Sequence, residues 1–340
     1  MQTIIIVGFG FMGGMHAQAY SKIAKARLTA AVDANVKAAA AALKQLGISV
    51  PVYRDLREAL TRHPADVIDI CLPTPLHGKF VRQALKAGRH VFCEKPFTAN
   101  AAEAFKLAEL AEKSGRSVQV GQCIRFWPEY EAFVEFVKSR KAGKLLSLTL
   151  QRRAGRPGYS MGDWLNKGKQ SGGAALDLHV HDTDFVHHLL GCPKAVTSVG
   201  TKDKTGWSHI FTTYHFDEIA VTAEGGWNYP PHWGFQMAFQ AIFEKGTVEF
   251  DSTVNPSLKL TLGTQAKRPL AFRVPSAGSS GSGAGNISSL GGYYNELAYF
   301  VGRLEKGRKP ALATPRQAAE SVRTVLAEIK SASTGRTVRL

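Results

Sequence analysis

Residues 4–13 indicate the fold of the first part of the chain, and they read Ile4-Ile5-Ile6-Val7-Gly8-Phe9-Gly10-Phe11-Met12-Gly13. A short β-branched run leads into a Gly-x-Gly-x-x-Gly pattern, which opens a helix predicted over residues 12–24. The first glycine permits a tight turn, the second lets the backbone approach a pyrophosphate, and the third lets helix and strand pack closely. The helix N-terminus then offers unpaired N–H groups to the phosphates. The stretch therefore predicts a dinucleotide-binding β–α–β unit.

Asp33 lies at the end of the next predicted strand, 20 residues after Gly13. A carboxylate at this place accepts hydrogen bonds from the hydroxyls of an adenosine ribose, and it repels a 2′-phosphate. The following residues, Ala34-Asn35-Val36, contain no arginine that would bind such a phosphate, although Lys37 comes next. The sequence therefore favours NAD over NADP.

Strand and helix patterns alternate through the first 120 residues. The predicted strands are 4–7, 28–32, 67–72, 90–93 and 117–120, and the predicted helices are 12–24, 36–46, 55–61, 77–87 and 101–114. Alternation of this kind is typical of a doubly wound parallel α/β sheet. We therefore predict a Rossmann domain over residues 1–121.

The pattern changes after Arg125. Strands are predicted at 145–152, 197–200, 210–215, 220–225, 247–250 and 258–262, mostly without long helices between them. A helix is predicted at 174–190, and two more at 293–306 and 315–333. We therefore predict an α+β domain over residues 122–340 with an open, mostly antiparallel sheet, and leave open whether the last helix packs on the first domain. Residues 276–286, rich in Ser and Gly, are predicted to form a flexible loop or lid.

The formal net charge of +16 allows several interpretations. It is compatible with a solvated basic surface, with an anionic cofactor or substrate, or with nucleic acid. Basic residues are scattered and no nucleic-acid motif is present, so a nucleic-acid partner is not predicted. The four cysteines show no CxxC or zinc spacing, the N-terminus does not resemble a signal peptide, and no stretch reaches membrane-spanning length. These features predict a cytoplasmic protein that does not bind membranes.

Five ordered motifs resemble the Gfo/Idh/MocA oxidoreductase family. They are Gly8–Gly13, Thr74-Pro75 with His77, Glu94-Lys95-Pro96, Gly121–Pro128 and Gly172–Asp184. The resemblance implies that Lys95 lies near the nicotinamide and that Asp177 and His181 form the family's Asp-xxx-His pair. It also implies cofactor contacts from Gly8, Gly10, Phe11, Met12, Gly13, Asp33, Pro73, Thr74, Pro75, His77, Glu94, Lys95, Gln122, Arg125 and Trp164. The chain departs from the family pattern in having Ser171 before Gly172-Gly173 and an extra imidazole at His179.

Asp177, His181, Asp184 and His188 would form one stripe on an α-helix. A zinc site is one interpretation, but no third committed ligand is evident, so no metal is predicted. Oxidation of an alcohol needs a base for the hydroxyl proton, and histidine suits that task at neutral pH. A carboxylate can orient the imidazole, and a lysine can stabilise the charge that develops on oxygen. Asp177, His181 and Lys95 supply these three groups.

Two further clusters are candidates for substrate binding. Trp227, Asn228, Tyr229, His232 and Trp233 could stack on a sugar and bind its hydroxyls, but could equally form a core edge. Arg152 lies beside Arg153 and near Arg156, and such a cluster either binds an anion or covers the surface. We take Arg152, Tyr229 and His232 as the candidate substrate contacts.

Three functions are compatible with these features. The first is an NAD-dependent oxidoreductase that transfers a hydride between nicotinamide and a hydroxyl-bearing carbon of a sugar, cyclitol or sugar derivative. The second is an NAD-dependent glycoside hydrolase with transient oxidation. The third is an NAD-binding sensor without activity, which the three chemical groups argue against. The resemblance also implies a homodimer or homotetramer formed through the open face of the second sheet. The substrate cannot be named from the fold.

Overall fold

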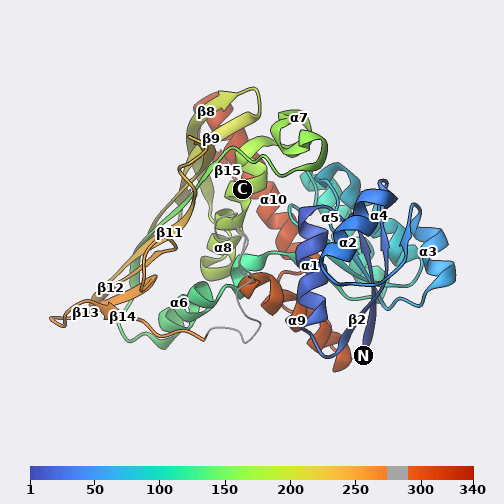
Figure 1. The fold of residues 1–340 in the computed structure, drawn as a ribbon. Coiled ribbons are helices and arrows are strands. Elements are labelled where there is room, and N and C mark those ends of the chain that lie inside the picture. The colour runs from blue at the N-terminus through green and yellow to red at the C-terminus, as the bar shows by residue number, and fades with distance from the viewer. Residues whose placement is uncertain (274–289) are drawn as a thin grey trace. The chain divides into compact units, whose positions relative to one another are not determined.

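The structure is a computed structural model that describes residues 1–273 and 290–340 in two compact units (Figure 1). The first unit comprises Met1–Cys123, Tyr159–Trp164 and Gly292–Ala319, and the second comprises Ile124–Gly158, Leu165–Gly291 and Glu320–Leu340. The first unit therefore includes residues 159–164 and 292–319 in addition to the predicted domain over residues 1–121. The Ser/Gly-rich stretch 276–286 lies outside the described residues.

The first unit is built on a six-stranded parallel sheet in the order β3-β2-β1-β4-β5-β6, which is the order of doubly wound dinucleotide-binding folds. Its strands are β1 (Gln2–Val7), β2 (Ala26–Val32), β3 (Val52–Tyr53), β4 (Val67–Ile70), β5 (His90–Glu94) and β6 (Val118–Gly121). The prediction of a Rossmann sheet is confirmed. The short strand β3 was not predicted.

Helices alternate with these strands: α1 (Phe11–Ser21), α2 (Val36–Gln45), α3 (Leu56–Arg62), α4 (Thr74–Lys86) and α5 (Ala101–Lys113). Side chains cap three of them, since Asn35, Asp55 and Asn100 each accept a backbone N–H of the first turn of α2, α3 and α5. Helix α9 (Gly291–Glu305) and the first turn of α10 (Pro315–Thr334) also belong to this unit, and Ala318 and Ala319 are part of its apolar core.

The second unit contains a nine-stranded sheet in the order β14-β13-β12-β11-β7-β10-β9-β8-β15. Among the strands that the structure describes in this sheet, only β7 and β10 pair in parallel, so the prediction of a mostly antiparallel sheet is confirmed. The strands are β7 (Leu145–Gly155), β8 (Ala195–Asp203), β9 (Gly206–His215), β10 (Ala220–Tyr229), β11 (Phe235–Phe243), β12 (Gly246–Asp251), β13 (Leu258–Leu262), β14 (Arg268–Pro269) and β15 (Val338–Arg339).

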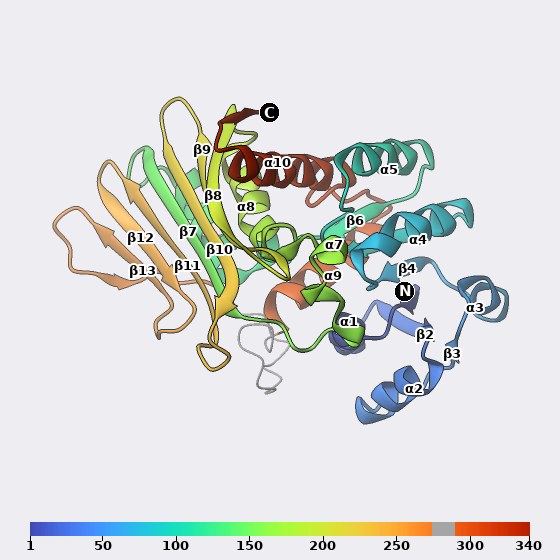
Figure 2. The same ribbon diagram turned by 90° about the horizontal axis from the view of Figure 1, so that it is seen from above.

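Helices cover one face of this sheet. Helix α6 (Pro128–Ser139) packs Tyr130 and Phe133 against Phe239 of β11, and α8 (Val180–Leu190) adds Phe185 to the same aromatic cluster. In the part of the chain that the structure describes, the other face carries no helix (Figure 2). An open face of this kind was predicted, and the homodimer or homotetramer expected through it stays a prediction.

Helix α6 and strand β11 were not predicted although the sequence contains a signal for each, and the short strands β14 and β15 were not predicted either. Helix α6 begins with Pro128 in its first turn, and its buried Tyr130, Phe133 and Val134 recur at helical spacing. Strand β11 alternates near its end, with Gln240 and Ile242 exposed between buried neighbours. The remaining short elements are the 3-10 helices at Cys123–Phe126 and Met161–Asn166, the helix α7 (Gly168–Ser171) and a π-helical turn at Ala175–His179. Among the described helices, none combines the length and apolar character needed to cross a bilayer.

Candidate active site

The glycine loop between β1 and α1 has the geometry of a pyrophosphate cradle. Gly8 has φ +92°, and a Cβ on it would lie 2.5 Å from the carbonyl oxygen of Cys71. A Cβ on Gly13 would lie 2.2 Å from the carbonyl oxygen of Gly8. A Cβ on Gly10, by contrast, would meet no atom within 4 Å, so the space in front of it is open to a ligand. Because α1 has no side-chain cap, its first N–H groups can bind phosphate oxygens. The loop therefore fits a dinucleotide.

This geometry predicts different outcomes for neighbouring glycines. Gly10→Ala should leave the melting temperature unchanged but weaken NADH binding by about tenfold or more, or ~1.4 kcal/mol, because its methyl group occupies the ligand's space. Gly13→Ala should lower the melting temperature because the methyl group meets the Gly8 carbonyl. Gly14→Ala is the matched control, since its Cβ would contact only Leu46 Cδ1 at 3.9 Å. Fluorescence titration with NADH and thermal melts check these outcomes, and wild-type affinity in Gly10→Ala would contradict the cradle.

Asp33 is held by the backbone at the end of β2. Its Oδ2 accepts the N–H of Phe9 at 2.7 Å and its Oδ1 accepts the N–H of Asn35 at 2.7 Å. The carboxylate thereby connects the glycine loop to the start of α2. It is partly exposed, so an approaching ribose can still reach it.

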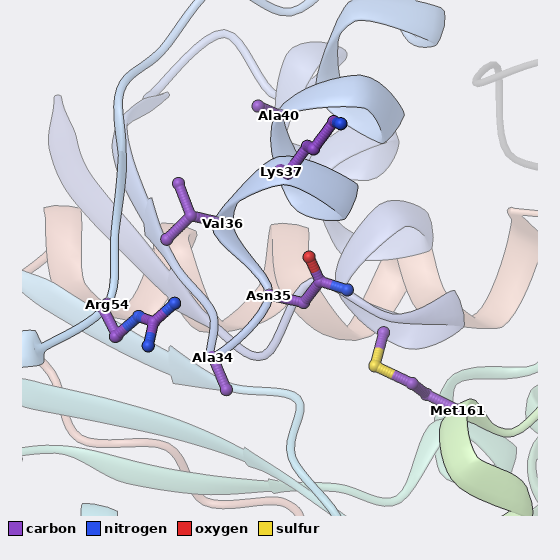
Figure 3. A pocket seen from close by; sticks show the side chains of 7 residues that line it. All are labelled: Ala34, Asn35, Val36, Lys37, Ala40, Arg54 and Met161. Carbon is purple, nitrogen blue, oxygen red and sulfur yellow. The ribbon is translucent and has the colours of Figure 1, made fainter.

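A cavity of about 670 Å³ in the first unit is lined in part by the residues directly after Asp33 (Figure 3). Its lining residues are Ala34, Asn35, Val36, Lys37, Ala40, Arg54 and Met161. Figure 3 shows Arg54 entering from the segment after β3, on the side of Ala34 and Val36. Sequence reasoning missed Arg54 because it considered only the residues next to Asp33, whereas the parallel pairing of β2 with β3 brings residue 54 to the same edge of the sheet. The cavity therefore has two cations, Lys37 and Arg54.

The loop after β4 and the turn after β5 are joined by one imidazole. Helix α4 begins directly after Pro73, with Thr74 buried and Pro75 in the first turn. His77 is buried, and its ring nitrogens lie 2.9 Å from the carbonyl oxygen of Pro96 and 2.7 Å from that of Leu72. Burial lowers the pKa of His77. The ring connects this loop to the Glu94-Lys95-Pro96 turn, and the cofactor contact expected of His77 stays a prediction.

The other cofactor candidates of the first unit occupy the ends of its strands and one later segment. Lys95 follows β5 and is partly exposed. Gln122 follows β6 and is buried. Trp164 is partly exposed and belongs to the 159–164 segment, which places it in this unit.

Asp177 and His181 lie on two kinds of helix in the second unit. The helix predicted over 174–190 is confirmed, but residues Ala175–His179 form a π-helical turn before α8 begins at Val180. A π-turn changes the side-chain register and often occurs at functional sites. Asp177 and His181 are 9 % and 8 % exposed, so both are largely shielded from water while a small part of each remains accessible.

The residues of the predicted stripe (Asp177, His181, Asp184 and His188) lie in different environments. Asp184 accepts two hydrogen bonds from Arg125, at 2.7 Å from Nε and 2.8 Å from Nη2, and both side chains are buried. Arg125 is therefore part of an internal ion pair. Burial lowers the pKa of His187 and His188 to about 4, so both rings are neutral at neutral pH.

His179, the extra imidazole, fills space above the sheet. It is fully buried, and its Nε2 lies 3.2 Å from Glu328 Oε2 and 3.3 Å from Tyr214 Oη. A Cβ on Gly225 of β10 would lie 2.7 Å from His179 Nδ1, so the absence of a side chain at Gly225 leaves room for the ring. His179 therefore connects the π-turn to β9 and α10 within the second unit.

The candidate substrate-binding residues differ in burial and in how far their polar groups are already engaged within the protein. Arg152 is 1 % exposed and donates to Asp182 at 2.8 Å from Nε and 2.9 Å from Nη2, which commits its guanidinium to the interior. Of the aromatic group, Trp227, Asn228 and Tyr229 lie at the end of β10, and His232 and Trp233 lie in the turn that follows it. Tyr229 donates to Glu224 Oε1 at 3.1 Å and packs on Trp233. His232 is exposed.

Comparisons with known proteins agree with both units. Residues 2–122 match the family model GFO_IDH_MocA, described as "Oxidoreductase family, NAD-binding Rossmann fold", and residues 130–249 match "GFO/IDH/MocA C-terminal domain". Inositol 2-dehydrogenase of Rhizobium meliloti (strain 1021) is 26 % identical over 322 residues, which cover 90 % of this chain and 89 % of that protein. Inositol 2-dehydrogenase of Arthrobacter sp. (strain FB24) is 30 % identical over 264 residues, which cover 74 % of each.

A solved structure of levoglucosan dehydrogenase, in complex with NADH and levoglucosan, matches with a TM-score of 0.85 at 19 % identity. The match covers 99 % of both chains and shows a shared fold. The family models, the inositol dehydrogenase relatives and the geometry of the glycine loop point the same way. The chain belongs to the Gfo/Idh/MocA family of NAD-binding oxidoreductases.

Proposed function

We propose that this protein is an NAD-dependent dehydrogenase that transfers a hydride between nicotinamide and a hydroxyl-bearing carbon of a sugar, cyclitol or sugar derivative. The observation that carries the proposal is the glycine loop, open in front of Gly10 and followed by Asp33, in a chain of this family. Relatives named inositol 2-dehydrogenase and D-glucoside 3-dehydrogenase support a polyol or sugar as the substrate class.

Three side chains have proposed catalytic roles. When bound, NAD⁺ supplies the hydride acceptor. His181 takes the proton of the substrate hydroxyl, since a partly accessible imidazole suits general acid–base chemistry near neutral pH. Asp177 orients that imidazole, and the Lys95 ammonium group stabilises negative charge on the oxygen as the C–H bond breaks and the C=O bond forms. In the reverse reaction protonated His181 donates the proton to the carbonyl oxygen, while the Lys95 ammonium and the Asp177 carboxylate keep their charges.

A panel of polyols tests the proposal. Purified protein is mixed with NAD⁺ and, separately, with myo-inositol, levoglucosan and simple glucosides, and the absorbance of reduced nicotinamide is followed. Growth of this absorbance with at least one polyol is the expected result. Release of the aglycone from a glycoside without net NADH would instead identify the hydrolase, and binding of NAD without any turnover would identify the sensor.

The cofactor preference depends on opposing charges. We expect the unmodified protein to bind NAD more tightly than NADP, because Asp33 repels a 2′-phosphate. Arg54→Ala should weaken NADP binding by about three- to tenfold and leave NAD binding unchanged, because an exposed guanidinium attracts the extra phosphate through solvent. Calorimetric titration of both cofactors at low salt measures this. Arg57→Ala serves as a control outside the cavity lining. Tighter binding of NADP than NAD by the unmodified protein would refute the preference.

A further inference from the structure

A group of buried ionisable side chains lies inside the first unit and is not part of the proposed chemistry. It contains His16 of α1, Asp69 of β4, Glu94 of β5 and Glu296 of α9, all between 0 % and 4 % exposed. Buried charges are costly unless they are paired, so a group of three carboxyls and one imidazole needs a physical reason. We call these four side chains the His16 cluster.

His16 lies between two carboxylates. Its Nδ1 is 2.8 Å from Asp69 Oδ2, and its Nε2 is 3.0 Å from Glu94 Oε1, the second contact being electrostatic rather than a well-aligned hydrogen bond. Burial by itself lowers the pKa of His16, but attraction to Asp69 and the hydrogen bond to it outweigh burial and raise the pKa well above its usual value. The ring is therefore an imidazolium at neutral pH that is hydrogen-bonded to Asp69 and attracted electrostatically to Glu94.

Glu94 is held from three sides. His16 contacts its Oε1, and its Oε2 accepts the backbone N–H of Lys95 at 3.1 Å. A Cβ on Gly121 of the neighbouring strand β6 would lie 2.9 Å from Oε1, so the carboxylate fills the space that the missing side chain leaves. The carboxylate thus connects helix α1 to the first residue of the turn after β5.

Glu296 completes the cluster. Burial raises its pKa well above the usual range, and the nearby Glu94 carboxylate raises it further. One of its carboxyl oxygens lies within 4.8 Å of one ring nitrogen of His16 and one carboxyl oxygen of Glu94. Burial therefore favours the protonated form of this third carboxyl, beside the two carboxyls that His16 contacts.

We propose that His16 is a positioning residue for Lys95: it holds the Glu94 carboxylate against the Lys95 backbone N–H and so fixes the turn that presents the lysine. The proposal rests on the proposed function, in which Lys95 acts on the reacting oxygen. The same imidazole lies on the helix that begins at the glycine loop, so one side chain couples the phosphate cradle to the lysine turn. Small displacements of such a group lower rates strongly, by about 100-fold for 1 Å.

Two conservative variants test the contacts of the two ring nitrogens of His16 separately. In His16→Gln the amide nitrogen can take the place of Nε2 and contact Glu94, whereas in His16→Asn it takes the place of Nδ1 and contacts Asp69. Leu107→Ala, in the apolar core of the same unit, is a control that lowers stability without touching the cluster. Hydrogen exchange of the Lys95 amide is followed by mass spectrometry of peptides that cover residues 93–98. Pro96 contributes no amide hydrogen to these peptides, which simplifies the measurement.

Exchange at Lys95 should accelerate most in His16→Asn, less in His16→Gln and least in Leu107→Ala, compared at temperatures equally far below each melting point. The kcat with the active polyol should follow the same order, with a loss of up to about 100-fold in His16→Asn. NADH titration is run on every variant. Failure of the unmodified protein to bind NADH would refute the proposed function, whereas the exchange order at Lys95 is a separate result that does not depend on turnover.

Two outcomes would overturn the proposal. One is equal exchange and equal kcat loss in His16→Asn, His16→Gln and Leu107→Ala, which is the behaviour of a purely structural residue. The other is one tightly bound divalent ion per chain in elemental analysis, lost in Glu296→Gln. In that case His16, Glu94 and Glu296 would be metal ligands, and a neutral imidazole would replace the imidazolium.

Discussion

His181→Ala is expected to lower turnover by about 10²- to 10⁴-fold, the usual scale for loss of a general acid–base group. The substrate hydroxyl then loses its proton acceptor, and His187 and His188 are weak bases because burial lowers their pKa to about 4. NADH affinity should stay close to that of the unmodified protein, since the glycine loop and Asp33 belong to the other unit. Steady-state kinetics with the active polyol and NADH titration measure both.

His179→Asn is the informative neighbour. His179 is fully buried beside Glu328 and Tyr214, so its replacement should lower the melting temperature and affect turnover less than His181→Ala. A greater loss of turnover in His179→Asn than in His181→Ala would show that His181 is not the proton-transfer residue. Near-full turnover in His181→Ala would also remove His181 from the mechanism.

Asp182→Ala is expected to destabilise the protein by about 3–5 kcal/mol, the typical effect of leaving a buried charge without its partner. Arg152 and Asp182 side chains are 2 % and 0 % exposed, and two parallel hydrogen bonds join them. Without the carboxylate, the guanidinium keeps its charge inside the second unit with no water to solvate it. Urea unfolding followed by circular dichroism measures the change in the free energy of unfolding.

Two comparisons isolate the cause of that loss. Replacing both partners, as in the double variant Arg152→Met with Asp182→Leu, should recover much of the stability because no unpaired charge remains. Arg156→Ala removes an ion pair with Asp203 whose side chains are 36 % and 28 % exposed, and should change stability by at most about 1 kcal/mol. Equal losses in Asp182→Ala and Arg156→Ala would show that burial of the pair is not the reason.

The dinucleotide-binding unit could be predicted from local sequence patterns. Gly8, Gly10 and Gly13 act through the backbone of one strand, one turn and one helix, so their spacing contains the geometry. Asp33 acts on the same turn and lies one strand away. Hydrophobic alternation likewise determined the mostly antiparallel second sheet, because a side-chain period of two is a local property.

Only the tertiary structure decided which charges meet. Arg125 pairs with Asp184 across 59 positions of sequence, and Arg152 pairs with Asp182 across 30, so neither arginine could be assigned as a surface or ligand group from its neighbours. Arg54 reaches the cavity after Asp33 through the pairing of two parallel strands. Residues far apart in the chain carry no pattern that specifies their contact.

The tertiary structure also decided the local form of the Asp177–His181 segment. Its composition predicts a regular α-helix, yet the first turn is π-helical, and His179 packs there over the glycine at position 225. Likewise, His16 has the appearance of an ordinary helix residue until Asp69, Glu94 and Glu296 converge on it from two strands and another helix. Propensity and periodicity describe one element at a time, whereas ionisation and helix register depend on burial and on partners that only the packed chain supplies.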